Sequence, residues 1–91
     1  MFLLNRTQKE NATKLRGLII GKSTSELESV KEGINTLGSL MLEEFKLEGN
    51  MIEYDKTSDN IRVLLAVVDQ EIFNVKRFKI TILSVDSELN I

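Results

Sequence analysis

The sequence predicts a single α+β domain, in which two N-terminal helices, at about 8–20 and 25–48, precede an antiparallel sheet of three or four strands. Three observations favour this fold class. Apolar residues recur every three or four positions in the first half of the chain. The second half has a short alternating segment at 51–55 and an almost wholly apolar segment at 61–68, both typical of strands. The helical and strand-like segments are also not interleaved, as they would be in a parallel α/β fold. We expect the sheet to pack on the second helix.

Length and composition fit one domain that spans residues 1–91. A chain of 91 residues can enclose one hydrophobic core. Its hydrophobic fraction of 42% and charged fraction of 29% are ordinary for a globular protein. The absence of proline fits a chain of helices and tight hairpins with few rigid loops.

The first helix is predicted to begin at a capping box formed by Thr7 and Glu10. Gly21 is expected to end it in a left-handed conformation. Between these signals, apolar residues follow helical spacing at Ala12, Leu15, Leu18 and Ile19.

The second helix has two alternative N-caps, Ser23 and Ser25, each with a glutamate three residues later. Gly49 and Asn50 are expected to end this helix. Gly38, inside it, is a position where a neighbouring element could approach closely, and Gly33 is another. One apolar stripe follows the predicted helix at Leu27, Val30, Ile34, Leu37, Met41 and Phe45.

The second half is predicted to form strands at 51–55, 61–68 and within 71–85, with turns at 56–60 and 69–70 and a loose tail at 86–91. The hairpin register depends on the second turn. A two-residue loop would place Arg62 opposite Arg77, which is repulsive. A three-residue loop, which we prefer, pairs Val67 with Phe73 and Leu65 with Val75.

Composition removes the residue types on which much enzyme chemistry depends. Without cysteine or histidine there is no thiolate zinc site, no thiol nucleophile and no imidazole base. The string 21–24, Gly-Lys-Ser-Thr, resembles the end of a P-loop, but three residues rather than four separate Gly17 from Gly21. Asp55 and Asp59 bracket a predicted turn, where aspartate usually bonds its own backbone. We therefore predict no catalytic, cofactor or metal site and no enzymatic activity.

The predicted second helix and the 61–68 strand carry more apolar surface than one contact on each requires. One explanation is that the first helix and the chain ends cover this apolar surface within a monomer. The explanation we favour is association with another chain. It predicts a small non-enzymatic protein–protein interaction or assembly subunit that self-associates, through an interface at Leu37, Leu40, Met41, Leu47, Leu64 and Ala66.

Charge is distributed unevenly: residues 1–22 are mainly basic and residues 23–49 mainly acidic. The basic first helix could lie against the acidic second helix, in the same chain or in a neighbour. The alternative function is a nucleic-acid-binding regulator whose phosphate contacts would be Arg6, Lys9, Lys14, Arg16, Lys76, Arg77 and Lys79. A helix-turn-helix is disfavoured, because its recognition helix would be the acidic one.

No apolar run approaches the ~20 residues that span a bilayer. The short apolar segment at 1–4 is too brief for the core of a signal peptide. We therefore expect no membrane span and a cytoplasmic location.

Overall fold

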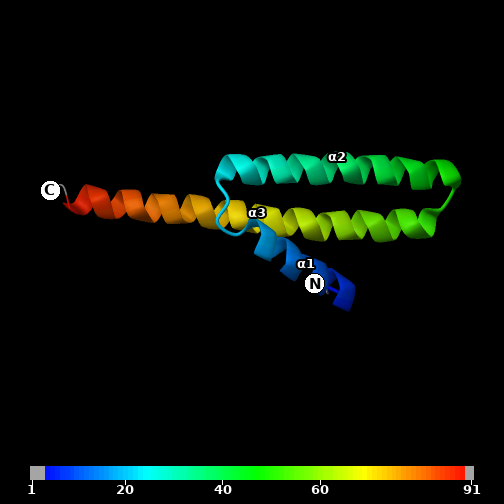
Figure 1. The fold of residues 1–91 in the computed structure, drawn as a ribbon, viewed down its shortest axis with the longest axis horizontal. Helices are drawn as coiled ribbons and strands as arrows, with labels where there is room; N and C mark the ends of the chain where they lie inside the picture. The colour runs from blue at the N-terminus through cyan, green and yellow to red at the C-terminus, as the bar shows by residue number, and fades with distance from the viewer. Residues whose placement is uncertain (1–3, 90–91) are drawn as a thin grey trace.

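The computed structural model describes residues 4–89, and the side chains of residues 4–77. This part of the chain forms three helices: α1 (Arg6–Ile19), α2 (Thr24–Glu48) and α3 (Met51–Leu89). Helices α2 and α3 form a long antiparallel hairpin, and α1 crosses α3 obliquely (Figure 1). The chain is elongated, with extents of 64 × 24 × 22 Å.

The predicted α+β class is wrong, because residues 4–89 contain no strand and the fold is all-helical. Every predicted strand and both predicted turns lie inside α3. The preferred hairpin register, with Val67 opposite Phe73, is wrong for the same reason. Of the predicted tail, residues 86–89 continue the helix, and residues 90–91 lie outside the described residues.

Two features of the sequence explain why α3 is one helix. No glycine or proline follows Gly49, so nothing in the chain breaks a helix there. An apolar residue also occupies every seventh position, which places one apolar stripe along a helix: Tyr54, Ile61, Val68, Val75, Ile82 and Leu89. A β-branched residue lowers helix stability by only a few tenths of a kcal/mol, whereas burying its side chain contributes about 1.5–3 kcal/mol. Burial therefore outweighs intrinsic strand preference.

Helix α3 also begins at a signal that strand prediction overlooked. The side-chain oxygen of Asn50 accepts a hydrogen bond from the backbone N–H of Glu53 at 3.3 Å. This is an N-cap contact, and it follows directly on Gly49, which ends α2 with φ of +73°. The tip of the hairpin is therefore a helix stop joined to a helix start.

The start of α1 differs from the prediction. Its N-cap is Asn5, whose side chain accepts a hydrogen bond from the N–H of Gln8 at 2.8 Å. The Gln8 side chain accepts one in return from the N–H of Asn5 at 3.0 Å, which completes a capping box. Glu10 forms an ion pair with Arg6 at 3.2 Å instead of capping. The predicted stop is confirmed, with Gly21 at φ +82°.

The prediction for α2 is confirmed at both ends. Of the two alternatives, Ser23 is the N-cap, and it forms a capping box with Glu26. Inside the helix, Gly38 packs directly under Ile61 of α3: a Cβ atom at Gly38 would lie 2.5 Å from Ile61 Cδ1. Gly33 has no such neighbour within 4 Å. Close approach is therefore confirmed at Gly38 alone.

The core lies where all three helices meet, around the middle of α3. Ile19 of α1, Leu27 of α2 and Val68 of α3 are almost fully buried there, at 1%, 0% and 0% exposed. Helix α1 packs on α3. The suggestion that the basic first helix lies against the acidic second helix of the same chain is therefore wrong.

Helix α3 continues well beyond the hairpin. Its 39 residues extend roughly 59 Å, against about 38 Å for the 25 residues of α2. Figure 1 shows the C-terminal end of α3 projecting past the start of α2, with no other described helix beside it. Within the described residues, no helix is long and apolar enough to cross a membrane.

Candidate interaction surfaces

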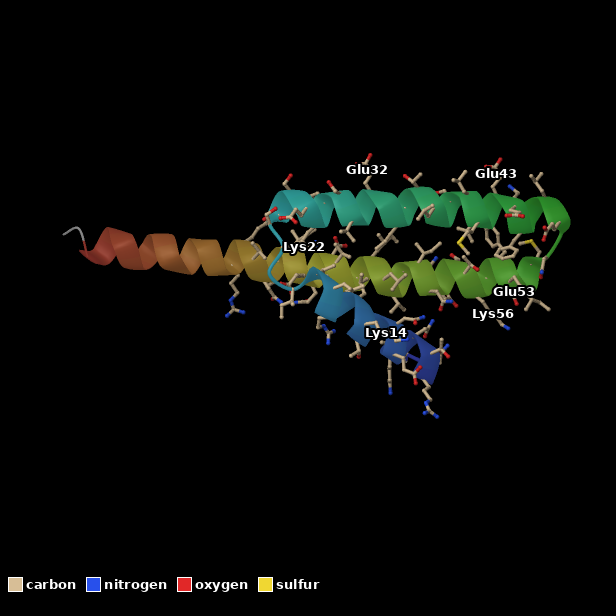
Figure 2. The ribbon with its side chains drawn as sticks, viewed as in Figure 1. Lys14, Lys22, Glu32, Glu43, Glu53 and Lys56 are labelled. Atoms are coloured by element: carbon tan, nitrogen blue, oxygen red, sulfur yellow. The ribbon has the colours of Figure 1, made fainter. Side chains whose placement is uncertain are left out.

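Helix α2 exposes a row of large apolar side chains, which we call the α2 apolar flank. Its members are Leu37, Leu40, Met41 and Leu47, which are 65%, 60%, 49% and 82% exposed. The helix faces α3 through Leu27, Ile34 and Gly38. The α2 apolar flank lies to one side of this face, turned away from α3. Figure 2 shows Glu32 and Glu43 on the outer edge of α2, pointing away from α3. The flank is thus bordered by buried contacts on one side and by acidic residues on the other.

Two further predicted interface residues lie elsewhere. Leu64 is half-buried on α3 and, with Gln8 and Asn60, lines a small space between α1 and α3. Ala66 is exposed, but on the side of α3 that faces a groove next to α1. The structure therefore brings together the four predicted residues of α2 and separates them from the two of α3.

That groove was not predicted from the sequence. It has a volume of about 350 Å³ and is open to solvent between α1 and α3. Its lining combines apolar side chains with two guanidinium groups and one amide: Leu4, Ala12, Arg16, Arg62, Val63, Ala66, Val67 and Gln70. The groove exists because α1 crosses α3 at an angle, a geometry that residue spacing within either helix does not reveal.

A buried amide fixes where α1 crosses α3. Gln8 is only 7% exposed, and its side-chain N–H group donates a hydrogen bond to the side-chain oxygen of Asn60 at 3.2 Å. Because the Gln8 oxygen also takes part in the α1 capping box, one side chain both starts α1 and ties it to α3. The sequence signal was available, as Asn5 and Gln8 have capping-box spacing.

One ion pair joins the two helices of the hairpin within the described side chains. Lys31 Nζ of α2 lies 2.9 Å from an Asp69 carboxylate oxygen of α3. The hydrogen bond to Asp69, and then its negative charge, raise the pKa of Lys31 above 10.5. Both side chains are more than a third exposed, so solvent screening keeps the contribution to stability small.

The α2 N-terminus perturbs a second charged group. The pKa of Glu26 is lowered from 4.5, first by the hydrogen bond from the backbone N–H of Ser23 and then by that residue's hydroxyl and by nearby Lys22. The same contacts account for the P-loop-like string. Gly21 ends α1 and Ser23 caps α2, so these residues form a stop and a start rather than a phosphate cradle.

The candidate phosphate contacts do not form one face on α1. Arg6, Lys9, Lys14 and Arg16 are all exposed. Residues two apart on a helix point about 200° away from each other, so Lys14 and Arg16 lie on nearly opposite sides. Figure 2 shows Lys14 projecting away from α3, whereas Arg16 lines the groove against α3. Further along α3, Lys76 and Arg77 are exposed, and the side chain of Lys79 lies outside the described residues.

The carboxylates of the described residues do not form a metal-binding cluster. Asp55 and Asp59, predicted to bracket a turn, are exposed residues one helical turn apart on α3. Among the side chains that the structure describes, no three aspartate, glutamate, histidine or cysteine residues are placed to hold a metal ion.

The fold and these surfaces define a class of protein: a small helical hairpin with a third helix packed across it. The chain matches no family model, and neither a curated protein nor a solved structure shows significant similarity to it.

Proposed function

We propose that this chain is a small non-enzymatic protein–protein interaction or assembly subunit that self-associates. The observation that carries the proposal is the α2 apolar flank, where four large side chains on one helix are between 49% and 82% exposed. Exposed apolar side chains that gather on one side of a helix are typical of interaction sites, and here they surround the exposed Glu44.

The flank is large enough to matter energetically. Fully burying one leucine or methionine side chain contributes about 1.5–3 kcal/mol, so burying four that are half to four-fifths exposed contributes about 4–8 kcal/mol per chain. Two chains that bury such flanks together would gain about twice that. This is comparable with the estimated 4–15 kcal/mol cost of bringing two molecules together.

The apolar surface also extends to the tip of the hairpin. Leu42, Leu47 and Tyr54 line a shallow hollow of about 650 Å³ where α2 meets the start of α3, together with the polar residues Ser39, Glu43 and Lys46. Met51 and Ile52, which follow the tip, are 51% and 70% exposed. A partner that covers the α2 apolar flank can therefore bury further apolar surface at the end of the hairpin.

The proposal is tested by the oligomeric state of the full chain. Light scattering coupled to size-exclusion chromatography, from about 5 to 500 µM, is expected to show assembly that increases with concentration. A triple variant, Leu37→Ser, Leu40→Ser and Leu47→Ser, should weaken assembly. The control, Leu18→Ser with Ile20→Ser, removes exposed apolar side chains from the last turn of α1 and from its C-cap, and it should not weaken assembly. Circular dichroism establishes that each variant stays helical. A monomeric wild-type chain throughout this range would overturn the proposal.

Nucleic-acid binding stays the competing prediction, and the cytoplasmic location belongs to the same proposal. Titration of a fluorescent oligonucleotide at low and high salt separates the two functions. Phosphate contacts release counterions, so binding through Lys9, Lys14 and Arg16 would weaken steeply with salt. Salt-sensitive, saturable binding in a monomeric chain would favour the nucleic-acid function over assembly.

A further inference from the structure

Figure 1 shows the projecting end of α3 with no other described helix beside it, and the sequence continues an apolar seven-residue series into this end. Tyr54, Ile61 and Val68 belong to the seven-residue series that packs on α2, as the close Gly38–Ile61 contact shows. The same series continues at Val75, which packs against the core, and then at Ile82 and Leu89. Helix α2 begins at Thr24, and Figure 1 shows the C-terminal end of α3 extending past that start. The interface of the hairpin therefore has a continuation that the described part of the chain leaves without a second helix.

The projecting residues have the pattern of a coiled-coil seam. With Val75, Ile82 and Leu89 assigned to heptad position a, position d falls on Phe78 and Val85. Both positions are thus apolar throughout residues 75–89. A sustained a/d series of this kind favours pairing with another helix of the same kind.

Charge within the segment favours one orientation of that pairing. Lys76, Arg77 and Lys79 lie at its beginning, and Asp86 and Glu88 lie at its end. Two copies side by side in parallel would place like charges together. Two antiparallel copies would place the basic beginning of each beside the acidic end of the other.

We propose that residues 78–89 of α3 pair with the same segment of a second copy of this chain, as an antiparallel two-helix coiled coil. The inference deepens the proposed self-association by naming one interface and its partner. In antiparallel coiled coils, a residues pack against d residues of the partner, which matches Ile82 with Val85 of the second copy and Phe78 with Leu89. In that register the flanking e positions place Lys79 opposite Asp86, once on each side of the two-fold axis.

This register predicts an unusual charge-swap behaviour. Lys79→Glu alone would place two carboxylates opposite each other at both sites, and Asp86→Lys alone would place two ammonium groups there. Each single variant should therefore self-associate at least about tenfold more weakly than wild type at low salt. An equimolar mixture of the two single variants should recover association, because every site then joins a glutamate or aspartate to a lysine. The double variant should recover it as well.

Positions 79 and 86 are two helical turns apart, too far to interact within one helix, where neighbours are three or four residues apart. Recovery in the mixture therefore reports a contact between copies. The measurement is sedimentation velocity of the full chain at 20 mM and 500 mM salt, with circular dichroism to check folding. A second measurement is fluorescence energy transfer between a labelled Lys79→Glu chain and a labelled Asp86→Lys chain, which reports their association with each other.

The outcomes separate this inference from the broader proposal. Recovery in the mixture supports antiparallel pairing. Wild-type association that neither charge variant changes overturns the inference and leaves association through the α2 apolar flank standing. A wild-type chain that remains monomeric up to about 500 µM overturns both.

Discussion

The contact between Gly38 and Ile61 gives the sharpest test of the packing between α2 and α3. Adding a methyl group at Gly38 would place Cβ 2.5 Å from Ile61 Cδ1 and 3.0 Å from its Cγ1. Gly33, in the interior of the same helix, has no atom within 4 Å of the equivalent position. The two glycines therefore share a helical environment and differ in packing, so the same substitution at each separates the two effects.

The expected magnitudes follow from two opposing terms. Alanine stabilises a helix interior by about 1 kcal/mol relative to glycine, and Gly33→Ala should gain that amount. Gly38→Ala gains the same preference but must displace the Ile61 side chain, an overpacking that typically costs about 1–3 kcal/mol. The two variants should thus differ by about 1–3 kcal/mol in unfolding free energy. For a domain of this size, each 1 kcal/mol shifts Tm by about 4–8 °C.

The assay is urea and thermal unfolding followed by circular dichroism, with all variants at one low protein concentration. Ile61→Val removes the Cδ1 atom and should cost about 0.5–1.5 kcal/mol in wild type but less, or nothing, in the Gly38→Ala background. Equal stabilisation by Gly33→Ala and Gly38→Ala, with no energetic coupling to Ile61→Val, would refute the packing of Gly38 of α2 against Ile61 of α3.

Three further outcomes are expected. Leu27→Ala, at a fully buried position, should lower the unfolding free energy by about 2–5 kcal/mol. Leu47→Ala, at an 82% exposed position, should change the unfolding free energy of the monomer by less than ~0.5 kcal/mol. Equal losses in the two variants would contradict the assigned burial. Because the pKa of Lys31 is raised in the folded state, its pairing with Asp69 stabilises below pH 10.5 and is lost as the pH rises through the folded pKa. Chemical unfolding from pH 8 to 12 should therefore show the deficit of Asp69→Asn shrinking at high pH, and a deficit that grows would disprove the sign. Gln8→Ala removes the Gln8 half of the α1 capping box and its hydrogen bond to Asn60 of α3, and it should lower the unfolding free energy by about 1–2 kcal/mol. Amide hydrogen exchange should then accelerate in α1 before it does in α2. Unchanged exchange protection of α1 would argue against the contact with Asn60.

Local signals explain which parts of the fold were predictable. Helix α2 has an N-cap at Ser23 and a stop at Gly49, and each signal depends only on residues a few positions away. The stop was predicted, and Ser23 was one of the two alternative caps. At the start of α1, the sequence contains two overlapping capping-box patterns. The box starting at Asn5 prevails over the one starting at Thr7, since asparagine is the better N-cap and Gln8 is also bonded to Asn60.

The error in the second half came from weighing short alternating and apolar runs above longer spacing. Alternation at 51–55 and the almost wholly apolar segment 61–68 suggested strands. The sequence also has an apolar residue at every seventh position, a pattern that only a helix converts into a single face. Asn50 and Glu53 supplied a helix start as well. These signals were present in the sequence, and the seven-residue spacing is the one that would have corrected the fold class.

The prediction of surplus apolar surface separates into two parts. Segment 61–68 was expected to need two covers, and the structure supplies both from the same chain. Val63 and Val67 face α1, and Ile61 faces α2. The α2 residues differ, because α3 covers only one side of α2. Leu40 and Leu47 are left exposed as a result.

The sequence by itself determined the stop of α2 and narrowed its start to two serines. It also determined the lack of thiol and imidazole side chains and the amount of apolar surface that must be covered. Those properties depend on residue identity and on neighbours within one or two helical turns. Only the tertiary structure decided which apolar residues are covered. It places α1 across α3 rather than on α2, opens the groove beside Arg16 and Arg62, and leaves the α2 apolar flank exposed. The physical reason is that burial depends on which faces of distant helices meet, and hydrophobic attraction between those faces carries no direction of its own.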